Sequence, residues 1–561
     1  MPNLSIKNIL ATILILFPIA VFYFVFQKYA VNIPHWDDFA IRNTLAQMIE
    51  TESVFQKIKL LFSQHNEHRI FLTRFSAWIV YLLEGTLNLK SLMLVGIIAL
   101  LGILFLLYKV SKKYNSSLLA FVPISFIFLN VGLFENTFWG MASVQNFGVI
   151  FFAFLTFYWL VFSVENKHRH YFYFAIFSCF LGVFTSSNGI IIPLIGCLVL
   201  LVQQRKTQLV VFLSSSVVLV FGFFYGFQKN PDNVVKTDFS DVKTIIKGTL
   251  ATFGSVLDSS AIAPAKHLDL AMAFGLFILI FICLFAYQVI FKKYNLSERT
   301  VDLFLLACLA FISITSVGIA VARISYGIEI LMTSKYKIYS VLSMVIFYLV
   351  AYNSLAERYK NNFTQLAIVF SIGFNLYTYL TVYQDIKYLN QERITDQFKQ
   401  QYSDKSFPNG GIMRVLQQPE KAFYDSIIDE IWQMKDSSLN NLKVTPKLES
   451  FEITKTNKGV KFDFSAAESG LYFVLKSDKN SYLYPSHIKP RGMKAYLERD
   501  FILNNQLKID NFTAEISKLY IQSGQYRVGI VVVENNTKKI SWSNQILDIQ
   551  AIEKIRPKQN W

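Results

Sequence analysis

The amino-acid sequence predicts an α-helical polytopic membrane protein with about eleven transmembrane helices and a small β domain at the C-terminus. Hydrophobic residues make up 53% of the 561 residues and charged residues only 16%, and the mean hydropathy is +0.38. This composition is too apolar for a soluble protein. Apolar runs of membrane-spanning length recur up to about residue 384, and the alternation of polar and apolar residues that is typical of strands follows from about residue 447.

The first predicted span is the apolar run from Asn8 to Gln27. No small-residue cleavage site follows it, so we expect it to remain in the chain as a helix. The ten further spans are expected at residues 91–109, 118–134, 147–163, 172–188, 190–203, 209–227, 269–291, 301–320, 337–355 and 364–382. The span 190–203 is short and follows its neighbour closely, so a count that differs by two is the alternative.

The loops between the spans indicate the orientation of the chain. Six short segments on one side of the predicted membrane are basic, and they contain Lys7, Lys109, Lys112, Lys113, Lys167, Arg169, Arg205, Lys206, Lys292, Lys293, Arg299, Arg358 and Lys360. Because basic loops stay in the cytoplasm, we expect the N-terminus inside, and an odd number of spans then places the C-terminus outside. The net charge of +16 is therefore attributed to orientation and to anionic lipids, and we expect no nucleic acid partner.

Longer segments outside the membrane are expected at about 28–90, at 228–268 and after 384. The first of them holds two stretches with helical periodicity, Phe39 to Phe62 and Ile70 to Leu83. We expect both to form helices that lie in the membrane interface. A true span at 70–88 is the alternative, against which the charges of Arg74 and Glu84 argue.

The pattern divides the chain into a transmembrane domain at 1–384, a helical linker region at 385–446 and a β domain at 447–561. Short alternating runs separated by turn residues make an antiparallel sandwich the expected fold of the β domain. Its acidic residues are scattered and form no catalytic constellation. We therefore interpret it as a folding cap or a docking module.

Nearly every unusual polar cluster of the first domain maps to one face of the predicted membrane, the outer one. The first of these clusters is Trp36-Asp37-Asp38. Two adjacent carboxylates repel each other and resist desolvation, so this pair suits taking a proton, binding a cation or binding sugar hydroxyls. The alternative is structural, with one acid capping the helix that starts at Phe39.

The densest polar cluster of the first outer loop is the run from His65 to Arg69, which also contains Asn66, Glu67 and His68. If this run is helical, His65, His68 and Arg69 share one face. The imidazoles and the guanidinium suit phosphate or sugar binding, whereas zinc would need further ligands that have no suitable spacing nearby. A solvated loop with chance clustering is the alternative.

Glu135 and Asn136 close the third span and Gln145 opens the fourth, with Trp139 between them. A short aromatic hairpin with amides and an acid at its ends resembles the wall of a sugar site. Interfacial anchoring by Trp139 is the alternative, but it does not explain Glu135 at the edge of the hydrocarbon.

Arg323 and Lys335 flank a loop after the ninth span, and Tyr336 follows directly. Arginine binds phosphate through a planar fork and lysine supplies a point charge. Both cations lie on the side of the predicted membrane where the positive-inside rule expects few. Orientation alone therefore explains them poorly, and we predict a phosphate site.

Together these motifs resemble a family of bacterial polytopic membrane proteins that are regarded chiefly as glycosyltransferases of the GT-C type. The resemblance covers roughly residues 1–385, and it rests on Trp36-Asp37-Asp38, the His65–Arg69 run before an interfacial helix, Glu-Asn-x-x-Trp-Gly-x-x-x-x-Gln from Glu135, Arg-x-x-x-Gly from Arg323, and Ser334-Lys335-Tyr336. Where the family has Ser-Arg-Tyr, this chain has Ser-Lys-Tyr, which keeps the charge but loses the fork.

The resemblance implies a GT-C fold, a sugar donor linked to polyprenyl phosphate, and a glycan, lipid or protein acceptor. It implies that Asp37 is the general base and that Asp38 supports it. It gives phosphate-binding roles to Arg323, Lys335, Arg69, His65 and His68, and substrate-binding roles to Trp36, Glu67, Glu135, Asn136, Trp139, Gln145 and Tyr336. No cofactor is certain, and a need for a divalent cation stays open. The protein is expected in the bacterial inner membrane with the β domain in the periplasm.

Two other functions are weighed against this one. A ligase or polymerase of lipid-linked glycan would also act at the outer face, but on an oligosaccharide pyrophosphate. A flippase or transporter would carry charges near the membrane midplane and internal repeats, and the predicted spans show neither. The identity of the bound donor discriminates between the first two.

Overall fold

The computed structural model describes residues 5–114, 116–163, 170–228, 242–259, 264–291 and 296–402, and in the C-terminal region residues 443–444, 451–455, 459–464, 471–478, 480–485, 512–517, 521–534 and 537–550. Contacts within the chain define two compact units. The first consists mainly of residues 1–30 and 36–382, and the second of residues 31–35 and 383–560.

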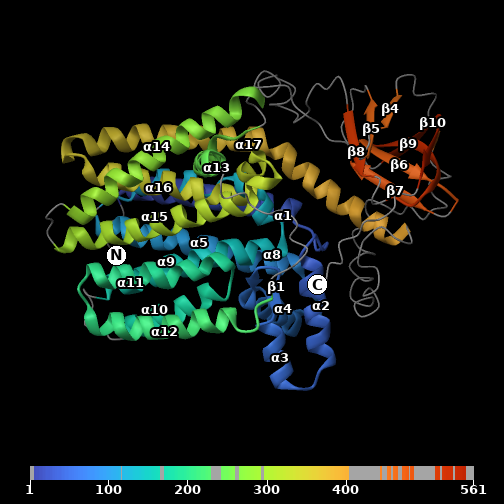
Figure 1. Cartoon of the computed structure of the whole chain (residues 1–561). Coiled ribbons are helices and arrows are strands. Elements are labelled where there is room, and N and C mark those ends of the chain that lie inside the picture. The colour runs from blue at the N-terminus through green and yellow to red at the C-terminus, as the bar shows by residue number, and fades with distance from the viewer. Residues whose placement is uncertain are drawn as a thin grey trace. The chain divides into compact units, whose positions relative to one another are not determined.

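In the described part of the chain, nine helical stretches are long and apolar enough to cross a membrane (Figure 1). They are α1 (Ile6–Tyr29), α5 (Leu89–Lys113), the stretch Leu119–Thr137 around α6 (Val122–Phe128), the stretch Gly140–Phe162 that ends in α9 (Gly148–Phe162), α12 (Lys206–Phe224), α14 (Pro264–Phe291), α15 (Leu296–Arg323), α16 (Lys337–Ser354) and α17 (Glu357–Tyr402). Two shorter apolar helices, α10 (His170–Val183) and α11 (Ile191–Val202), fall on the predicted spans 172–188 and 190–203. The prediction of a polytopic helical protein is confirmed.

Helices of the first unit are interrupted by short helical pieces where the polar motifs lie. These are η1 (Leu119–Phe121), η2 (Val131–Leu133), α7 (Phe134–Thr137), α8 (Gly140–Ala142), η3 (Ser143–Phe147), η4 (Ser187–Ile190), η5 (Ser255–Leu257), η6 (Ile324–Tyr326), η7 (Ile328–Met332) and η8 (Ser334–Tyr336), and the longer α13 (Val242–Gly254) precedes η5. The piece η3 is a π-helix, a wide turn that is frequent at functional sites.

Two glycines let these pieces lie close to their neighbours. A Cβ at Gly96 of α5 would stand 2.0 Å from Ser143 Oγ of η3, and one at Gly189 of η4 would stand 2.1 Å from the carbonyl oxygen of Gly182. Both approaches are too close for any side chain, so only glycine permits them. These close approaches place η3 against α5 and η4 against Gly182, and both pieces contribute to the site described below.

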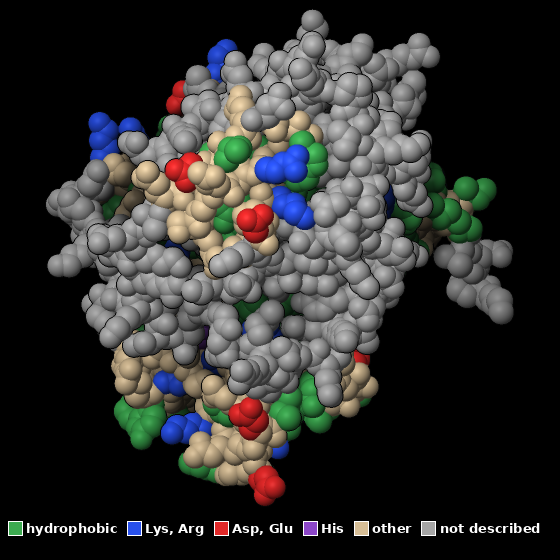
Figure 2. All heavy atoms as spheres, turned by 90° about the vertical axis from the view of Figure 1, so that its right-hand side faces the viewer, with side chains coloured by type: hydrophobic (Ala, Val, Ile, Leu, Met, Phe, Trp, Pro, Cys, Tyr) green, Lys and Arg blue, Asp and Glu red, His purple; other side chains and the backbone are tan. Residues whose placement is uncertain are grey.

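Three helices lie between α1 and α5: α2 (Asp38–Glu50), α3 (Val54–Leu61) and α4 (Phe71–Glu84). In Figure 1, α2 and α3 run across the direction of α9 and α12. The 14 residues of α4 are too few to cross about 30 Å of hydrocarbon. Helix α3 exposes Val54, Phe55 and Ile58 beside its lysines, and Figure 2 shows hydrophobic and charged side chains together at the bottom of the view, where these helices lie. Such an amphipathic surface fits the expected interfacial location.

The run from His65 to Arg69 is not helical, which overturns the helical arrangement considered from the sequence. Strands β1 (Gln64–His65) and β2 (His68–Arg69) pair antiparallel, with His65 opposite His68. Asn66 in the turn adopts a left-handed φ of 49°, which asparagine tolerates better than most residues. The two histidines are therefore cross-strand neighbours.

In the second unit, α17 continues to Tyr402, so the predicted linker region begins as a helix, while residues 403–442 lie outside the described residues. The strands are β3 (Lys443–Val444), β4 (Phe451–Lys455), β5 (Gly459–Phe464), β6 (Leu471–Lys476), β7 (Ser481–Pro485), β8 (Phe512–Ser517), β9 (Gly524–Glu534) and β10 (Thr537–Ile549). They form sheets in the orders β3-β10-β9-β6-β7 and β4-β5-β8. All described pairs are antiparallel except β3 with β10. Arg393 of α17 contacts His35, which joins residues 31–35 to this unit.

Candidate functional site

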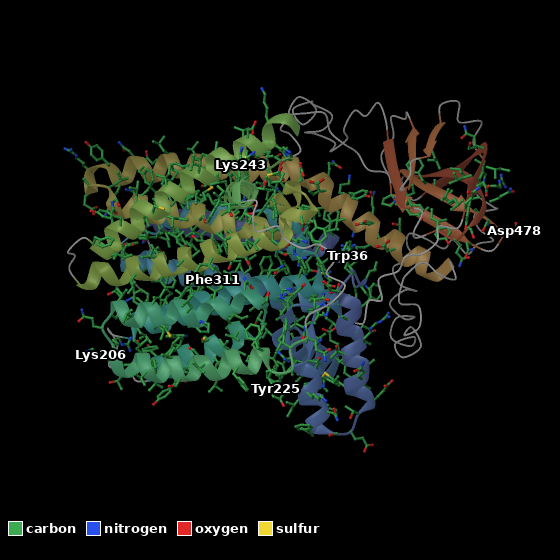
Figure 3. All side chains as sticks on the ribbon, viewed as in Figure 1. Trp36, Lys206, Tyr225, Lys243, Phe311 and Asp478 are labelled. Carbon is green, nitrogen blue, oxygen red and sulfur yellow. The ribbon has the colours of Figure 1, made fainter. Side chains whose placement is uncertain are left out.

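Several of the predicted polar clusters lie at one end of the helix bundle of the first unit. Lys206 and Tyr225 mark opposite ends of α12, and Trp36 lies at the Tyr225 end (Figure 3). Trp36 is 74% exposed and takes a left-handed φ of 45° immediately before α2. We call this end of the bundle the Trp36 end.

Asp37 and Asp38 occupy different environments. Asp38 is 1% exposed, and its Oδ1 accepts a hydrogen bond of 2.8 Å from the backbone N–H of Met141. It therefore caps the helical stretch that starts at Gly140, rather than the helix that starts at Phe39 as the sequence suggested. Asp37 precedes α2 without a capping bond from its side chain, which is 27% exposed, and its Oδ1 lies 3.7 Å from His65 Nε2. Asp37 is thus the carboxylate that remains accessible.

His68 is fixed by the turn before α11. Its Nδ1 accepts a hydrogen bond of 3.1 Å from the backbone N–H of Ser187 and lies 3.5 Å from Ser186 Oγ. Gln145 of η3 donates to the same Ser186 Oγ at 3.1 Å. The imidazole of His68 thereby joins three segments that are far apart in the sequence, namely the β1–β2 hairpin, η3 and η4. The sequence marks Ser186 and Ser187 as polar, but nothing in it shows that they contact His68.

The electrostatics of His68 link it to four titratable residues of the predicted site. Burial lowers the pKa of His68 to about 4, against the opposing effect of the Glu67 carboxylate. His65 and Arg323 lower that pKa further, and Asp37 raises it. Asp37, His65, Glu67, His68 and Arg323 therefore share one electrostatic environment at the Trp36 end.

Arg323 is the last residue of α15 and is half-buried. Within the described ranges of the chain, its guanidinium has no hydrogen-bond or ion-pair partner. A cation at a helix C-terminus is favoured by the helix dipole, but this contribution alone leaves the donors of the guanidinium unused. Arg323 is therefore placed to receive an anion.

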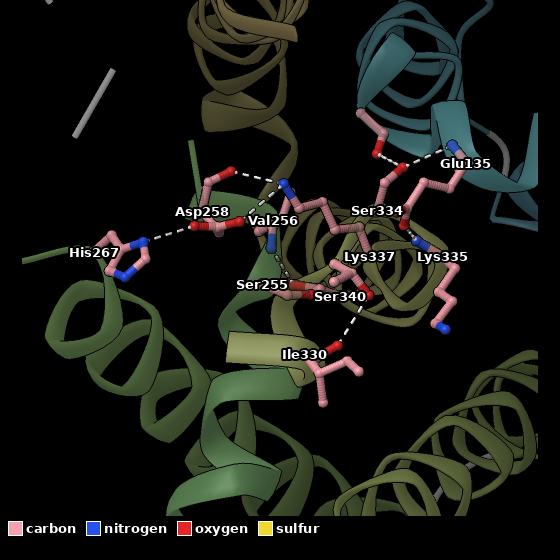
Figure 4. Close-up of polar contacts among 12 residues, drawn as sticks. Glu135, Ser255, Val256, Asp258, His267, Ile330, Ser334, Lys335, Lys337 and Ser340 are labelled. Carbon is pink, nitrogen blue, oxygen red and sulfur yellow. Dashed lines mark hydrogen bonds and ion pairs between the residues drawn. The ribbon is translucent and has the colours of Figure 1, made fainter. Parts of the chain in front are cut away.

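Glu135 and Asn136 hold the start of α16. Glu135 Oε2 accepts from the backbone N–H of Lys335 at 2.8 Å, and Ser334 Oγ accepts from the backbone N–H of Glu135 at 3.1 Å (Figure 4). Asn136 donates to the carbonyl oxygen of Lys335 at 2.8 Å and accepts from Asn146 at 2.7 Å. These contacts explain the acid at the edge of the hydrocarbon, because Glu135 accepts a hydrogen bond from the backbone just before α16 and so caps a helix start. The substrate-binding roles that the resemblance implies for this acid and amide gain no support.

The side chain of Lys335 points away from this network in Figure 4, and its Nζ lies 5.1 Å from the ring centre of Tyr336. On the other side of the α16 start, Lys337 Nζ lies 3.3 Å from Asp258 Oδ2, and Asp258 Oδ1 lies 3.0 Å from His267 Nδ1 (Figure 4). Sequence reasoning missed this second cluster, which joins η5, α14 and α16. A cleft beside it is lined by Asn130, Asp258, Lys337 and Thr378, among others, and by none of the predicted site residues.

Arg69 has a structural role instead of the expected phosphate-binding one. Its Nε donates to the carbonyl oxygen of Phe223, and its two terminal nitrogens donate to the carbonyl oxygens of Phe62 and Tyr225. Arg74 likewise donates to the carbonyl oxygens of Leu60 and Ser63. Both arginines satisfy carbonyls that helix ends leave without partners. The guanidinium of Arg69 is therefore turned to the main chain.

What remains at the Trp36 end is a partly exposed carboxylate, two histidines and an arginine that has no partner among the residues that the structure describes. An accessible acid can take a proton, and the guanidinium of an arginine can bind an anion. Among the described residues, no three His, Cys, Asp or Glu side chains form a group that could hold a metal ion. Comparison of the chain with protein-family models, with curated proteins and with solved structures finds no match.

Proposed function

We propose that this protein is a membrane glycosyltransferase of the GT-C type. It would move a sugar from a polyprenyl-phosphate donor to an envelope glycan, lipid or protein acceptor at the periplasmic face of the bacterial inner membrane. The observation that carries the proposal is that Asp37 and Arg323 both act electrostatically on His68, with Asp37 partly exposed and Arg323 without a partner in the described chain. The resemblance of the sequence motifs to GT-C enzymes supports the choice of reaction.

In this reaction the acceptor oxygen forms a bond to the anomeric carbon of the donor sugar. The bond between that carbon and the phosphate oxygen breaks, and the polyprenyl phosphate leaves with the electron pair. Asp37 takes the proton of the acceptor hydroxyl as general base. Arg323 stabilises the charge that develops on the leaving phosphate, and Lys335 is the second candidate cation.

The remaining parts of the chain serve this site. Asp38 keeps the loop in place by capping the stretch from Gly140. Helices α2 to α4 lie in the outer interface, where the lipid tail of a donor would pass. The C-terminal strands form a sandwich in the periplasm and act as a folding cap or as a docking module for the acceptor.

Paired variants of the two acids test the proposal. Asn keeps the size of Asp and is also a good helix cap, but it cannot take a proton. With protein reconstituted in lipid vesicles and supplied with polyprenyl-phosphate sugars and envelope acceptors, Asp37→Asn should lower transfer by roughly 10²-fold or more while the melting temperature stays near that of the wild type.

Asp38→Asn is the matched control, because it alters the neighbouring carboxylate, which is buried and capping. It should transfer at a rate near that of the wild type if Asp38 acts only by position. Activity in both single variants and in the double variant would show that the loop is structural and would remove the central support of the proposal. An inactive Asp38→Asn with an active Asp37→Asn would exchange the two roles.

A further inference from the structure

The hydrogen bonds of His68 determine where its proton lies. A backbone N–H can only donate, so the 3.1 Å contact between the N–H of Ser187 and Nδ1 of His68 requires an unprotonated Nδ1. Ser186 Oγ, which receives a hydrogen bond from Gln145, can direct its own proton to the same nitrogen at 3.5 Å. A neutral imidazole with a bare Nδ1 carries its hydrogen on Nε2.

The surroundings also disfavour a positive charge on this ring. Burial is the largest effect, and Arg323 and His65 act in the same direction. Glu67 and Asp37 act in the opposite direction and do not outweigh them, so the pKa of His68 stays at about 4. A second proton would also have to displace the N–H of Ser187 from Nδ1.

We propose that His68 is an uncharged hydrogen-bond donor to a phosphate oxygen, held in its Nε2–H form by Ser187, Ser186 and Gln145, and that the site consequently fits a singly charged phosphodiester better than a pyrophosphate. This inference rests on the proposed function and gives a physical reason for its donor class. Ser186 and Gln145 are positioning residues in it, because they act through His68.

The preference for a phosphodiester follows from the charges around His68. Arg323 is the one arginine or lysine among the charges that act on this ring, since Lys335, the second candidate cation, is not among them; Asp37 and Glu67 are the two acids that act on it. A ligand with one negative charge matches Arg323 and adds little repulsion from the acids. A pyrophosphate carries at least one charge more, for which the neutral imidazole offers a hydrogen bond but no counter-charge.

The first test is spectroscopic and does not depend on catalysis. In protein labelled with ¹⁵N-histidine and reconstituted in lipid nanodiscs, His68→Gln assigns the His68 resonances by their loss. These resonances should report a bare Nδ1 and a protonated Nε2 throughout pH 5.5 to 8. A protonated Nδ1, or an imidazolium at neutral pH, overturns the proposal.

Ser187→Pro suits the backbone at this position, and its ring Cδ takes the place of the N–H and displaces the imidazole of His68 from this contact. Ser187 is the first residue of η4 and Ser186 before it is extended at φ −160° and ψ 158°, which are the conditions under which proline is tolerated. Proline removes the N–H that occupies Nδ1, whereas the control Ser187→Ala keeps it. Ser187→Pro should change the His68 resonances and raise the pKa of His68, and Ser187→Ala should leave both as in the wild type. Identical spectra for both variants would contradict the role of this N–H.

The second test measures binding of prenyl phosphates of one chain length. The wild type should bind a prenyl phosphosugar diester about tenfold or more tightly than the prenyl pyrophosphate. His68→Gln keeps an uncharged N–H donor and should retain affinity for the diester within about threefold, whereas His68→Leu should lose about tenfold or more. His68→Lys should lower the preference for the diester, because it adds the missing charge.

The outcomes separate the two proposals. A wild-type protein that binds neither compound overturns the proposed function together with the role of His68. Binding of the diester that is insensitive to His68→Leu overturns only the role of His68. Tighter binding of the pyrophosphate refutes the substrate preference and favours a ligase or polymerase of lipid-linked glycan.

Discussion

Replacement of Arg323 by alanine separates binding from folding. The guanidinium has no hydrogen-bond or ion-pair partner in the described chain, so its removal breaks no contact of that kind. The folded state loses only the favourable position of a cation at the C-terminus of α15, worth about 0.3–1 kcal/mol. The transition state for transfer loses a charge-assisted phosphate contact worth about 2–4 kcal/mol. We therefore expect kcat/KM to fall roughly 30- to 800-fold with little change in melting temperature.

The assay compares purified variants in lipid vesicles at equal protein content, with transfer followed by mass spectrometry of the product. Arg358→Ala is the matched control, because it removes an exposed arginine that stacks at 4.6 Å on Tyr359 and lies outside the predicted site. Arg323→Lys keeps the charge without the planar fork and should fall between alanine and the wild type.

A second readout follows from the electrostatics of His68. Because Arg323 lowers the pKa of His68, Arg323→Ala should raise that pKa, while Arg358→Ala should leave it unchanged. Near-normal transfer by well-folded Arg323→Ala protein would remove Arg323 from the site. A lost activity that comes with a lowered melting temperature would instead show that the arginine stabilises the fold.

Three further outcomes are expected. Arg69→Ala should destabilise the protein by roughly 2–5 kcal/mol in chemical or thermal unfolding, because three backbone carbonyls, one buried and two partly buried, lose a charged donor; an unchanged stability would refute the capping role. A reporter that is active only in the cytoplasm, fused after Trp561, should be silent, and a bright signal would reverse the proposed orientation. His68 has its pKa lowered from 6.5 to about 4, so its contribution to stability is complete above pH 6.5 and is lost as the pH falls toward 4. His68→Gln should remove that part of the pH dependence of the melting temperature, and an unaltered profile would contradict it.

The helices of the first unit could be predicted from the sequence because the thickness of a bilayer sets the length of an apolar run. The short run 190–203 departs from this rule, because α11 lies there but is one of the shorter apolar helices, below the length of the nine candidate spans. The hairpin from His65 to Arg69 could not be predicted, because it depends on distant partners. Its geometry is fixed by contacts such as that of Arg69 with Tyr225 and that of His68 with Ser187, which are 156 and 119 residues away in sequence.

The roles of individual polar residues were harder to predict than their location. Arg69 and Arg323 are the same residue type at the ends of apolar segments, and the sequence predicts phosphate binding for both. What distinguishes them is the number of unsatisfied carbonyls within reach, which only the folded chain defines. Arg69 meets three, at Phe62, Phe223 and Tyr225. Arg323 meets none in the described chain.

The broken helices explain why so many polar residues gather at the Trp36 end. Each interruption leaves backbone donors or acceptors that a membrane-embedded protein must satisfy internally. Asp38 and Glu135 meet this demand at helix starts and Arg69 meets it at a helix end. A side chain that caps a helix end cannot also exchange protons or release a product without disturbing the fold. The proposed chemistry therefore falls to residues that cap no helix end in the described chain, and Asp37 and Arg323 are the pair on which the proposed reaction depends.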